Sequence, residues 1–178
     1  MKGKVIWITG LSGAGKTTVA NELCQRFQKH GLMPILLDGD ILREIFSTNY
    51  KSNEYYNRGA RIILSYQYGM LCKSLSAQGF TVIISTISMY KEVYEWNRAN
   101  LPNYFEVFLK VPLKELYRRD PKGIYNKFSS GKINNVVGLD VKVDEPIGAN
   151  VVVDFKPGQS TKQIVDHIVN KLDMKVLN

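Results

Sequence analysis

The chain has few of the residues that build disulfide or metal frameworks, with two cysteines and two histidines among 178 residues. Cys24 and Cys72 fall on the apolar faces of expected helices, and no partner ligand lies near either in sequence. We therefore expect two small core side chains rather than a disulfide or a metal pair. No apolar run approaches the length of a membrane span, and no signal-peptide segment follows the basic start of the chain. With no repeat and no low-complexity tract, residues 1–178 are most simply one cytoplasmic domain with a sizeable core.

Acidic residues are also outnumbered, since 16 aspartates and glutamates face 24 lysines and arginines, which gives a formal net charge of +8. The basic residues are spread along the chain and form no block, which argues against a nucleic-acid-binding surface. Two interpretations remain: a site that holds two polyanions at once, or a basic surface that serves solubility. The motif at residues 10–17 favours the first.

Residues 10–17 read Gly-Leu-Ser-Gly-Ala-Gly-Lys-Thr and match the phosphate-binding pattern G-x-x-x-x-G-K-[ST] at every fixed position. The apolar, β-branched run at 4–9 is typical of a buried strand, and the apolar spacing over 17–30 is typical of a helix. In that setting backbone N–H groups turn inward at a helix N-terminus, Lys16 reaches the β- and γ-phosphates, and the Thr17 hydroxyl holds Mg²⁺. The alternative is a glycine-rich turn that merely begins a helix. The expected ATP-binding residues are Gly10, Leu11, Ser12, Gly13, Ala14, Gly15, Lys16, Thr17 and Thr18.

Strand-like and helix-like segments alternate along the chain, which is the pattern of a parallel sheet covered by helices. A long helix is expected over about residues 54–77, where apolar positions recur at three- and four-residue spacing before Gln78-Gly79 ends it. Pro112 begins a helix after the fourth strand, and Ser160 caps the last helix. The five expected strands are residues 4–9, 34–38, 80–85, 104–109 and 150–154.

Residues 120–148 contain neither a strong strand nor a long helix, and glycines and prolines interrupt this basic stretch. A loop of that length in a compact α/β domain is usually functional, so we expect a lid over about residues 118–148. The alternative is a surface excursion without a role.

Two carboxylates follow the second expected strand, in the sequence Leu37-Asp38-Gly39-Asp40. The carboxyl edge of an open α/β sheet is where ligands bind, so both acids are expected beside the phosphate loop. There they can position Mg²⁺ and accept a proton from an attacking hydroxyl. Asp40 is also a candidate N-cap for a helix beginning at Ile41, and both roles are compatible. Arg43, one helical turn later, presents a forked guanidinium that suits phosphate.

These motifs occur with others in a fixed order: residues 10–18, Asp38-Gly39-Asp40 with Arg43, Ile87-Ser88-x-Tyr90, and Arg-Asp-Pro-Lys-Gly-Ile-Tyr at 119–125. The order continues through 106–108, 112–113, 131–133, 138–140 and 145–146. Over nearly the whole chain it resembles the adenylylsulfate (APS) kinase family. The phosphate loop is generic, whereas Asp-Gly-Asp combined with Arg-Asp-Pro-Lys-Gly-x-Tyr is specific to that family.

The resemblance implies a P-loop NTPase fold, a three-layer α/β/α sandwich with a five-stranded parallel sheet and a mobile lid. It implies Mg²⁺- and ATP-dependent phosphorylation of the ribose 3′-hydroxyl of a small nucleotide with a modified 5′-phosphate. Asp40 would be the base and Lys16 a second catalytic residue, and Arg119 would join the ATP-binding set. The family habitually forms homodimers, although this sequence leaves the oligomeric state open. The implied acceptor-binding residues are Asp38, Asp40, Arg43, Tyr56, Gly59, Ile87, Ser88, Lys122, Gly123, Tyr125 and Val136.

The departures from the family pattern fall on the acceptor side. Tyr56 replaces an arginine expected at the phosphosulfate, and Gly59 replaces an asparagine. Val136 replaces the phenylalanine that stacks on the acceptor adenine, a contact worth about 1–3 kcal/mol per base. Ser88-Met89-Tyr90-Lys91 replaces Ser-Pro-Tyr-Arg. The parts that serve the phosphate donor, ATP, match the family pattern: the phosphate loop, Asp38-Gly39-Asp40 and the lid.

A smaller base and an uncharged 5′ substituent would suit these losses. Cytidine diphosphoramidate, the acceptor of a capsule-pathway kinase in this superfamily, meets both conditions. Tyr55, Tyr56 and Tyr90 are candidates to supply a new stacking surface. The alternatives are an adenylylsulfate kinase that makes 3′-phosphoadenylylsulfate, another small-molecule kinase on the same scaffold, and a nucleotide-binding module without kinase activity. The last would leave Asp38-Gly39-Asp40 without a purpose.

Overall fold

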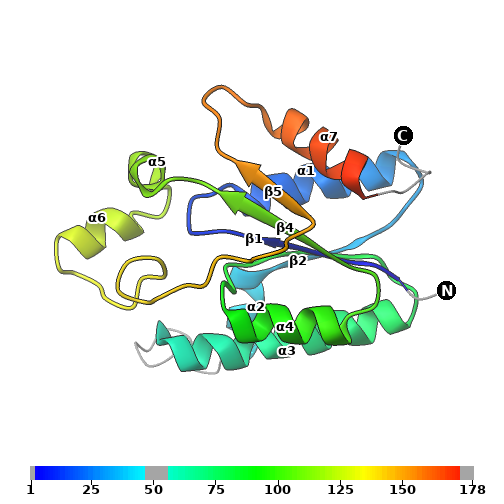
Figure 1. The fold of residues 1–178 in the computed structure, drawn as a ribbon, viewed down its shortest axis with the longest axis horizontal. Coiled ribbons are helices and arrows are strands. Elements are labelled where there is room, and N and C mark those ends of the chain that lie inside the picture. Colours follow the sequence, from blue (N-terminus) through cyan, green and yellow to red (C-terminus); the bar gives the residue numbers. More distant parts are fainter. Residues whose placement is uncertain (1–2, 47–55, 173–178) are drawn as a thin grey trace.

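A five-stranded parallel sheet forms the middle layer of the protein in a computed structural model that describes residues 3–46 and 56–172 (Figure 1). All four neighbouring strand pairs are parallel, and the strand order is β2-β3-β1-β4-β5. This sheet confirms the predicted α/β fold. The strands are β1 (Val5–Thr9), β2 (Ile35–Asp38), β3 (Val82–Ser85), β4 (Tyr104–Lys110) and β5 (Val151–Asp154).

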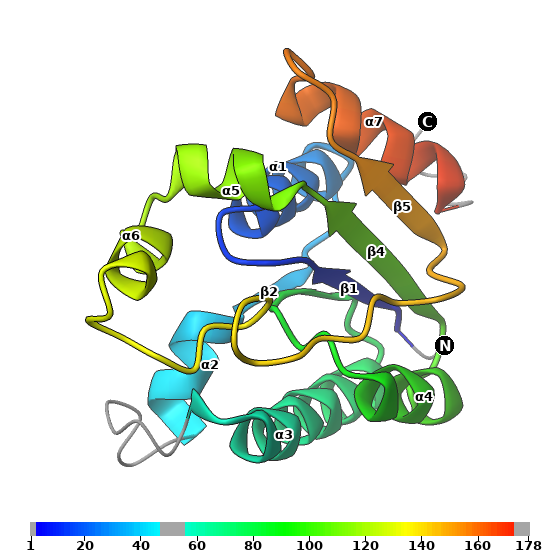
Figure 2. The ribbon, with the colours of Figure 1, turned by 60° about the vertical axis from the view of Figure 1, so that its left-hand side comes forward.

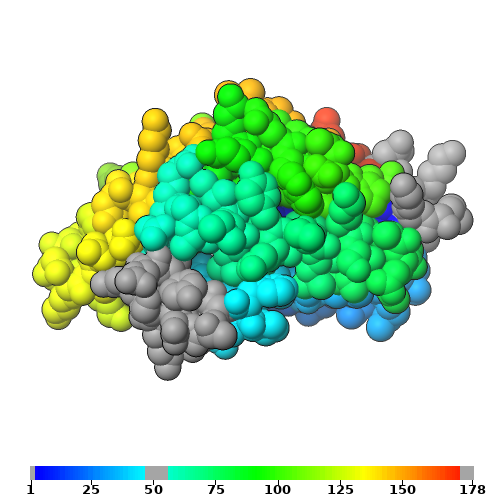
Figure 3. Space-filling view, turned by 90° about the horizontal axis from the view of Figure 1, so that it is seen from below, coloured from blue at the N-terminus to red at the C-terminus, as the bar shows by residue number. Residues whose placement is uncertain are grey.

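Helices cover both faces of the sheet. Helices α1 (Lys16–Lys29) and α7 (Thr161–Lys171) lie on one face, and α3 (Arg58–Ala77) and α4 (Lys91–Asn100) lie on the other (Figure 1). In Figure 3, α3 and α4 make up most of the visible surface. Three shorter helices are α2 (Gly39–Phe46), α5 (Leu113–Arg119) and α6 (Ile124–Ser129). Helices α5 and α6 lie beyond the carboxyl ends of the strands (Figures 1 and 2).

The alternation of side chains along β1 divides the core between the two faces. Ile6 and Ile8 belong to the cluster under α1 and α7, whereas Val5 and Trp7 belong to the cluster under α3 and α4. All five residues of β1 are buried, as expected for a central strand covered on both sides. The phosphate loop therefore follows directly on a strand that is buried along its whole length.

Most expected element boundaries agree with the structure within a few residues. The long helix begins at Arg58, where the Asn57 side chain accepts the N–H of Ala60; residues 54 and 55 lie outside the described residues. Ser160 and Gln163 form a capping box at the start of α7. The predictions for Pro112 and Ser160 are thus confirmed.

Two local features differ from the sequence-based expectation. Helix α4 was not predicted, because it is short and its buried face includes the polar side chain of Asn97. The prediction that Asp40 caps a helix is wrong: α2 already begins at Gly39, and Asp38 accepts the N–H of Asp40 at 2.9 Å.

The two cysteines are free and buried, Cys24 on the buried face of α1 and Cys72 on that of α3 across the sheet, which confirms their core role. Within the described residues, no helix combines the length and apolar character needed to cross a membrane. Between residues 120 and 148 the regular elements are α6 and one isolated bridge joining Val137 to Val141.

Candidate active site

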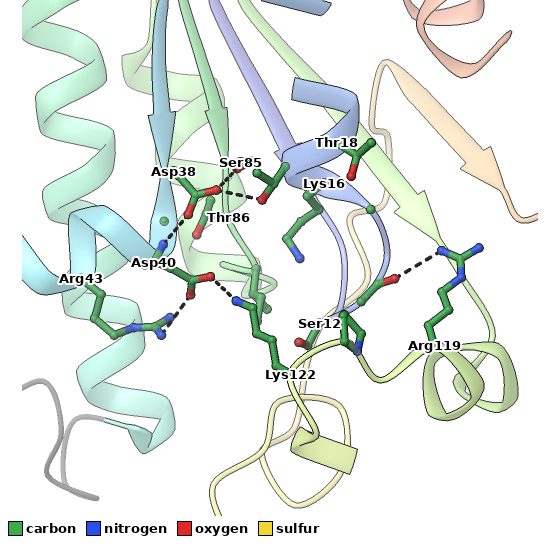
Figure 4. Close-up of a pocket in the computed structure, with 16 residues that line it drawn as sticks. Ser12, Lys16, Thr18, Asp38, Asp40, Arg43, Ser85, Thr86, Arg119 and Lys122 are labelled. Atoms are coloured by element: carbon green, nitrogen blue, oxygen red, sulfur yellow. Dashed lines mark hydrogen bonds and ion pairs between the residues drawn. The ribbon is translucent and has the colours of Figure 1, made fainter. Parts of the chain in front are cut away.

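A cavity of about 690 Å³ opens at the carboxyl edge of the sheet. The phosphate loop and the start of α1 form one wall, and the ends of β2 and β3 with α2 form another. Arg119, at the end of α5, and Lys122 approach from a third side (Figure 4). Pro121 also lines the cavity. The residues that line it are Ser12, Gly13, Gly15, Lys16, Thr17, Thr18, Asp38, Gly39, Asp40, Arg43, Ser85, Thr86, Ile87, Arg119, Pro121 and Lys122.

The phosphate loop has the backbone conformation that its glycines predict. Gly13 and Gly15 adopt φ values of 76° and 94°, which L side chains rarely adopt, and Gly15 is the N-cap of α1. The Lys16 ammonium donates to the carbonyl oxygen of Leu11 at 2.9 Å. Burial lowers the pKa of Lys16 to about 8. The loop thus presents a positive helix end and a cation to the same space.

Asp38 faces the phosphate loop across the cavity. One of its oxygens, Oδ2, accepts from the Thr17 hydroxyl at 2.8 Å and from the Ser85 hydroxyl at 2.9 Å. Asp38 was expected both among the acceptor-binding residues and as one of two acids that can position Mg²⁺, and here it pairs with the phosphate-loop threonine. Hydroxyl and carboxylate oxygens at this distance are the hard donors that Mg²⁺ prefers, so these residues fit the predicted ion.

Asp40 lies between two cations. Its Oδ2 pairs with the Lys122 ammonium, and its Oδ1 lies 3.4 Å from Arg43 Nη1. Figure 4 shows Lys16, Asp40 and Lys122 pointing into the same part of the cavity. Burial by itself would raise the pKa of Asp40, but Lys122, Arg43 and Lys16 together hold it below its usual value. The carboxylate is therefore ionised at neutral pH, the state that a general base requires.

Arg119 and Tyr125 are anchored to the phosphate loop by hydrogen bonds. Arg119 Nη1 donates to the carbonyl oxygen of Gly13 at 3.3 Å, and its guanidinium lies 5.1 Å from the ring centroid of Phe155. The Tyr125 hydroxyl donates to the carbonyl oxygen of Ser12 at 2.8 Å. Tyr125 is buried, so in this conformation it supports the loop rather than facing the cavity.

The other expected residues lie around the cavity rather than in its wall. Tyr56, beside the start of α3, stacks between two guanidiniums, and Gly59 is exposed in the first turn of that helix. Gly123 is the N-cap of α6 with φ 64°, and Val136 is buried. Ser88 lines a smaller pocket next to the cavity. Gly10, Leu11 and Ala14 shape the phosphate loop without lining the cavity.

Sequence reasoning missed three residues near the site. Ser85 is the last residue of β3, and Thr86 follows it. The Ser85 hydroxyl donates a hydrogen bond to Asp38. The rule that placed Asp38 at the carboxyl edge applies equally to them. Arg61 lines the smaller pocket from α3, and no local spacing distinguishes it from other helical arginines.

Comparisons with known proteins agree with this geometry. Residues 2–154 match the family model "Adenylylsulphate kinase". A cytidine diphosphoramidate kinase from Campylobacter jejuni is 38% identical over 94% of this chain and 95% of its own length. A probable adenylyl-sulfate kinase from Archaeoglobus fulgidus is also 38% identical, over 84% of this chain and 94% of its own length.

Among solved structures, the Mycobacterium tuberculosis APS kinase in complex with AMPPNP and APS superposes with a TM-score of 0.86. It is 29% identical, and the match covers 97% of this chain and 99% of that one. The chain belongs to the adenylylsulfate kinase family of ATP-using phosphotransferases.

Proposed function

We propose that this chain transfers the γ-phosphoryl group of ATP to the ribose 3′-hydroxyl of a nucleotide with a modified 5′-phosphate, and that cytidine diphosphoramidate is the acceptor. The observation that carries the kinase proposal is Asp40, an ionised carboxylate in the same cavity as Lys16. A nucleotide-binding module without catalysis has no need for a base beside its phosphate site.

The donor half consists of the phosphate loop and the residues that face it. Backbone N–H groups at the start of α1 and the Lys16 ammonium would bind the β- and γ-phosphates. Thr17 and Asp38 would hold Mg²⁺, which when bound neutralises charge that develops on the phosphate oxygens. Arg119 would cover the nucleotide from the lid side.

Asp40 would orient the acceptor hydroxyl and accept its proton as the oxygen attacks phosphorus. Proton removal by a positioned base contributes about 10²–10⁴-fold in rate. Lys122 pairs with that carboxylate in this structure. The acceptor hydroxyl must therefore either bind the carboxylate beside Lys122 or take the place of Lys122. We propose that residues 118–148 form a lid and that Lys122 leaves Asp40 for substrate oxygens when both nucleotides are bound.

Sequence identity alone does not identify the acceptor, since the Campylobacter and Archaeoglobus kinases are both 38% identical to this chain, although the Campylobacter match covers more of it, 94% against 84%. Among the acceptor-side departures, the one at Val136 supports the pyrimidine. The loss of the arginine at Tyr56 does not separate the two acceptors, because a terminal phosphoramidate and a sulfonate each keep one negative charge, so the expectation of an uncharged 5′ substituent does not favour cytidine diphosphoramidate. Val136 is buried and offers no ring for a purine. Of the proposed stacking residues, Tyr55 lies outside the described residues and Tyr90 is buried.

The second candidate is adenylylsulfate as acceptor, which the Archaeoglobus relative and the solved APS kinase support. Donor chemistry would be the same, and only the acceptor would differ.

Product analysis tests the reaction type. The purified chain is incubated with ATP, Mg²⁺ and either acceptor, and the product is examined by NMR for coupling between a new phosphorus and ribose H3′. We expect 3′-phosphorylated product and ADP in equal amounts, and none from a 3′-deoxy acceptor. ATP consumption without 3′-product, or product from the 3′-deoxy acceptor, would contradict the proposal.

A further inference from the structure

The turn between α5 and α6 carries Lys122, the residue that pairs with the candidate base. The N–H of Gly123 donates to the carbonyl oxygen of Asp120 at 3.0 Å, which closes a β-turn over residues 120–123. Aspartate, proline and glycine stand at the positions that each favours in such a turn, the first, second and fourth. Lys122 therefore occupies the third position, at the tip of the turn, and its side chain points toward Asp40 (Figure 4).

The Asp120 carboxylate joins this turn to the start of α6. Oδ1 accepts the N–H of Tyr125 at 3.1 Å, and Oδ2 accepts the N–H of Asn126 at 3.0 Å. Burial alone would raise the pKa of Asp120, but the N–H groups of Asn126, Tyr125 and Ile124 hold it below its usual value. The carboxylate is therefore charged at neutral pH, and it binds donors that the helix itself leaves unpaired.

The backbone of Asp120 is strained. It has φ 23° and ψ 56°, in the left-handed region that residues other than glycine rarely adopt. Such a conformation persists where the surrounding contacts hold it, and conformations of this kind are concentrated at functional sites. The hydrogen bonds from α6 to the carboxylate and the turn bond from Gly123 are contacts that hold it here.

Both flanks of the turn are bonded to the phosphate loop. Arg119, just before the turn, donates to the carbonyl oxygen of Gly13. Tyr125, just after it, donates to that of Ser12. The turn itself also approaches the loop, since a Cβ on Gly13 would lie 3.4 Å from Pro121 Cδ. The backbone of the turn is therefore held in place relative to the phosphate loop, whereas the exposed lysine side chain at its tip can change partners.

We infer that Asp120 is a positioning residue for the proposed phosphoryl transfer, and that it fixes the turn so that the Lys122 ammonium meets Asp40. The inference rests on the proposed function, because it concerns the same base. Asp120 is not one of the residues that line the cavity, so it acts through Lys122 and not on a substrate.

Charged groups face Asp40 from other segments and from its own helix. They are Lys122 on the turn, Lys16 on α1, Asp38 on β2 and Arg43 on α2. Among these groups, Lys122 alone lies on the turn that Asp120 holds. A change at Asp120 should therefore alter this contact and leave the others in place.

The test is a double-mutant cycle read on the pH profile. Asp120→Gly removes the carboxylate and adopts the positive φ without strain, and Asp120→Asn keeps an oxygen that can accept one N–H group. Each is made in the wild-type chain and in Lys122→Met, and kcat/KM is measured against pH for the acceptor that product analysis identifies. Gln163→Ala is the matched control, because Gln163 Oε1 also accepts a backbone N–H at a helix start, that of Ser160 at 2.9 Å before α7.

We expect Asp120→Gly to lower kcat/KM about tenfold at neutral pH, because a displacement of about 1 Å among catalytic groups can cost up to about a hundredfold. Loss of the Lys122 contact also raises the pKa of Asp40, so the acid limb of the profile, where kcat/KM falls on acidification, should move to higher pH. Asp120→Asn should lie between the wild type and Asp120→Gly.

In Lys122→Met, adding Asp120→Gly should lower kcat/KM by less than about twofold further, because the residue through which Asp120 acts is already gone. The acid limb should not move again. Gln163→Ala should leave the whole profile unchanged, although it also loses a helix cap.

Equal losses from Asp120→Gly in both backgrounds would mean that the carboxylate only supports the fold, and would overturn the inference. Wild-type kinetics in both Asp120→Gly and Asp120→Asn would overturn it as well. Should Asp120→Gly fail to fold, the same comparison made with Asp120→Asn decides. Wild-type kcat in Asp40→Asn would instead refute the proposed base, and the inference with it.

Discussion

Lys122 pairs with Asp40 across the mouth of the cavity, although 82 residues separate them in sequence. The pair joins the expected lid to the candidate base and holds the base ionised. Both side chains remain about half exposed, so incoming substrate oxygens can compete for either partner. The same contact would therefore couple the position of the proposed lid to the ionisation of Asp40.

Replacing Asp40 with asparagine tests the base directly. We expect Asp40→Asn to lower kcat about 10²–10⁴-fold with little change in the KM for ATP, because the amide cannot accept the proton. The measurement is steady-state kinetics together with a melting curve. Asp154→Asn, at an exposed acid on the far edge strand β5, is the control and should retain full activity. Wild-type kcat in Asp40→Asn would refute the assignment.

Lys122→Met tests the charge coupling. Lys122 lowers the pKa of Asp40, whereas burial raises it, so removing the ammonium should raise that pKa. Because the base works only when deprotonated, kcat/KM for the acceptor should begin to fall at a higher pH on acidification than in the wild type. Lys132→Met, at an exposed lysine in the same segment, should not change the pH at which kcat/KM falls on acidification. An acid limb at the same pH in both variants would show that Lys122 does not act on Asp40.

The lowered pKa of Lys16 predicts that kcat/KM for ATP falls at alkaline pH, the alkaline limb of the pH profile. Since that pKa is about 8, the free enzyme loses the ammonium charge as pH rises through this value. We expect kcat/KM for ATP to fall above about pH 8, where an ordinary lysine would stay charged. In Lys16→Arg the residual activity should lack this limb, because guanidinium keeps its proton. A flat wild-type profile to about pH 9.5 would contradict the prediction.

A stability prediction concerns Glu106, which is 1% exposed in the central part of the sheet. Arg98 donates to its Oε2 through Nε at 3.1 Å and Nη2 at 2.6 Å, and Oε1 has no partner among the described residues. Burial raises the pKa of Glu106, and Arg98 opposes that rise. Arg98→Met should therefore destabilise the fold by about 2–3 kcal/mol at neutral pH.

The loss in Arg98→Met should shrink toward pH 5, where the buried carboxyl takes up a proton at little cost. Urea unfolding at both pH values measures it. Arg118→Met removes an exposed arginine from an i,i+3 ion pair with Glu115 and should leave the free energy of unfolding nearly unchanged. A loss in Arg98→Met that does not depend on pH would mean that packing, not charge, accounts for it.

The sequence predicted the donor half of the site more fully than the acceptor half. The phosphate loop is local: its glycine spacing, lysine and threonine lie within nine residues between a strand and a helix. Asp38 and Asp40 were predictable because a short strand ends at an edge where ligands bind. The phosphate loop and the end of β2 depend on backbone geometry that is determined by residues close together in the sequence.

The acceptor half depends on side chains brought together from distant segments. Arg61 comes from α3, Tyr90 from the turn before α4, and Asn135 from the loop after α6. No periodicity connects these positions, so the sequence indicated no role for Arg61. The position of Asp40 inside α2, rather than at its N-cap, was likewise not apparent from the sequence, because it depends on where α2 begins.

The acceptor comparison tests the central claim most directly. The measurement is kcat/KM for cytidine diphosphoramidate and for adenylylsulfate, each with saturating ATP and Mg²⁺ and the same enzyme preparation. We predict that cytidine diphosphoramidate is preferred by at least about tenfold, because Val136 offers no ring on which a purine can stack. A preference of that size for adenylylsulfate would contradict the proposed acceptor and identify the chain as an adenylylsulfate kinase with a rebuilt site.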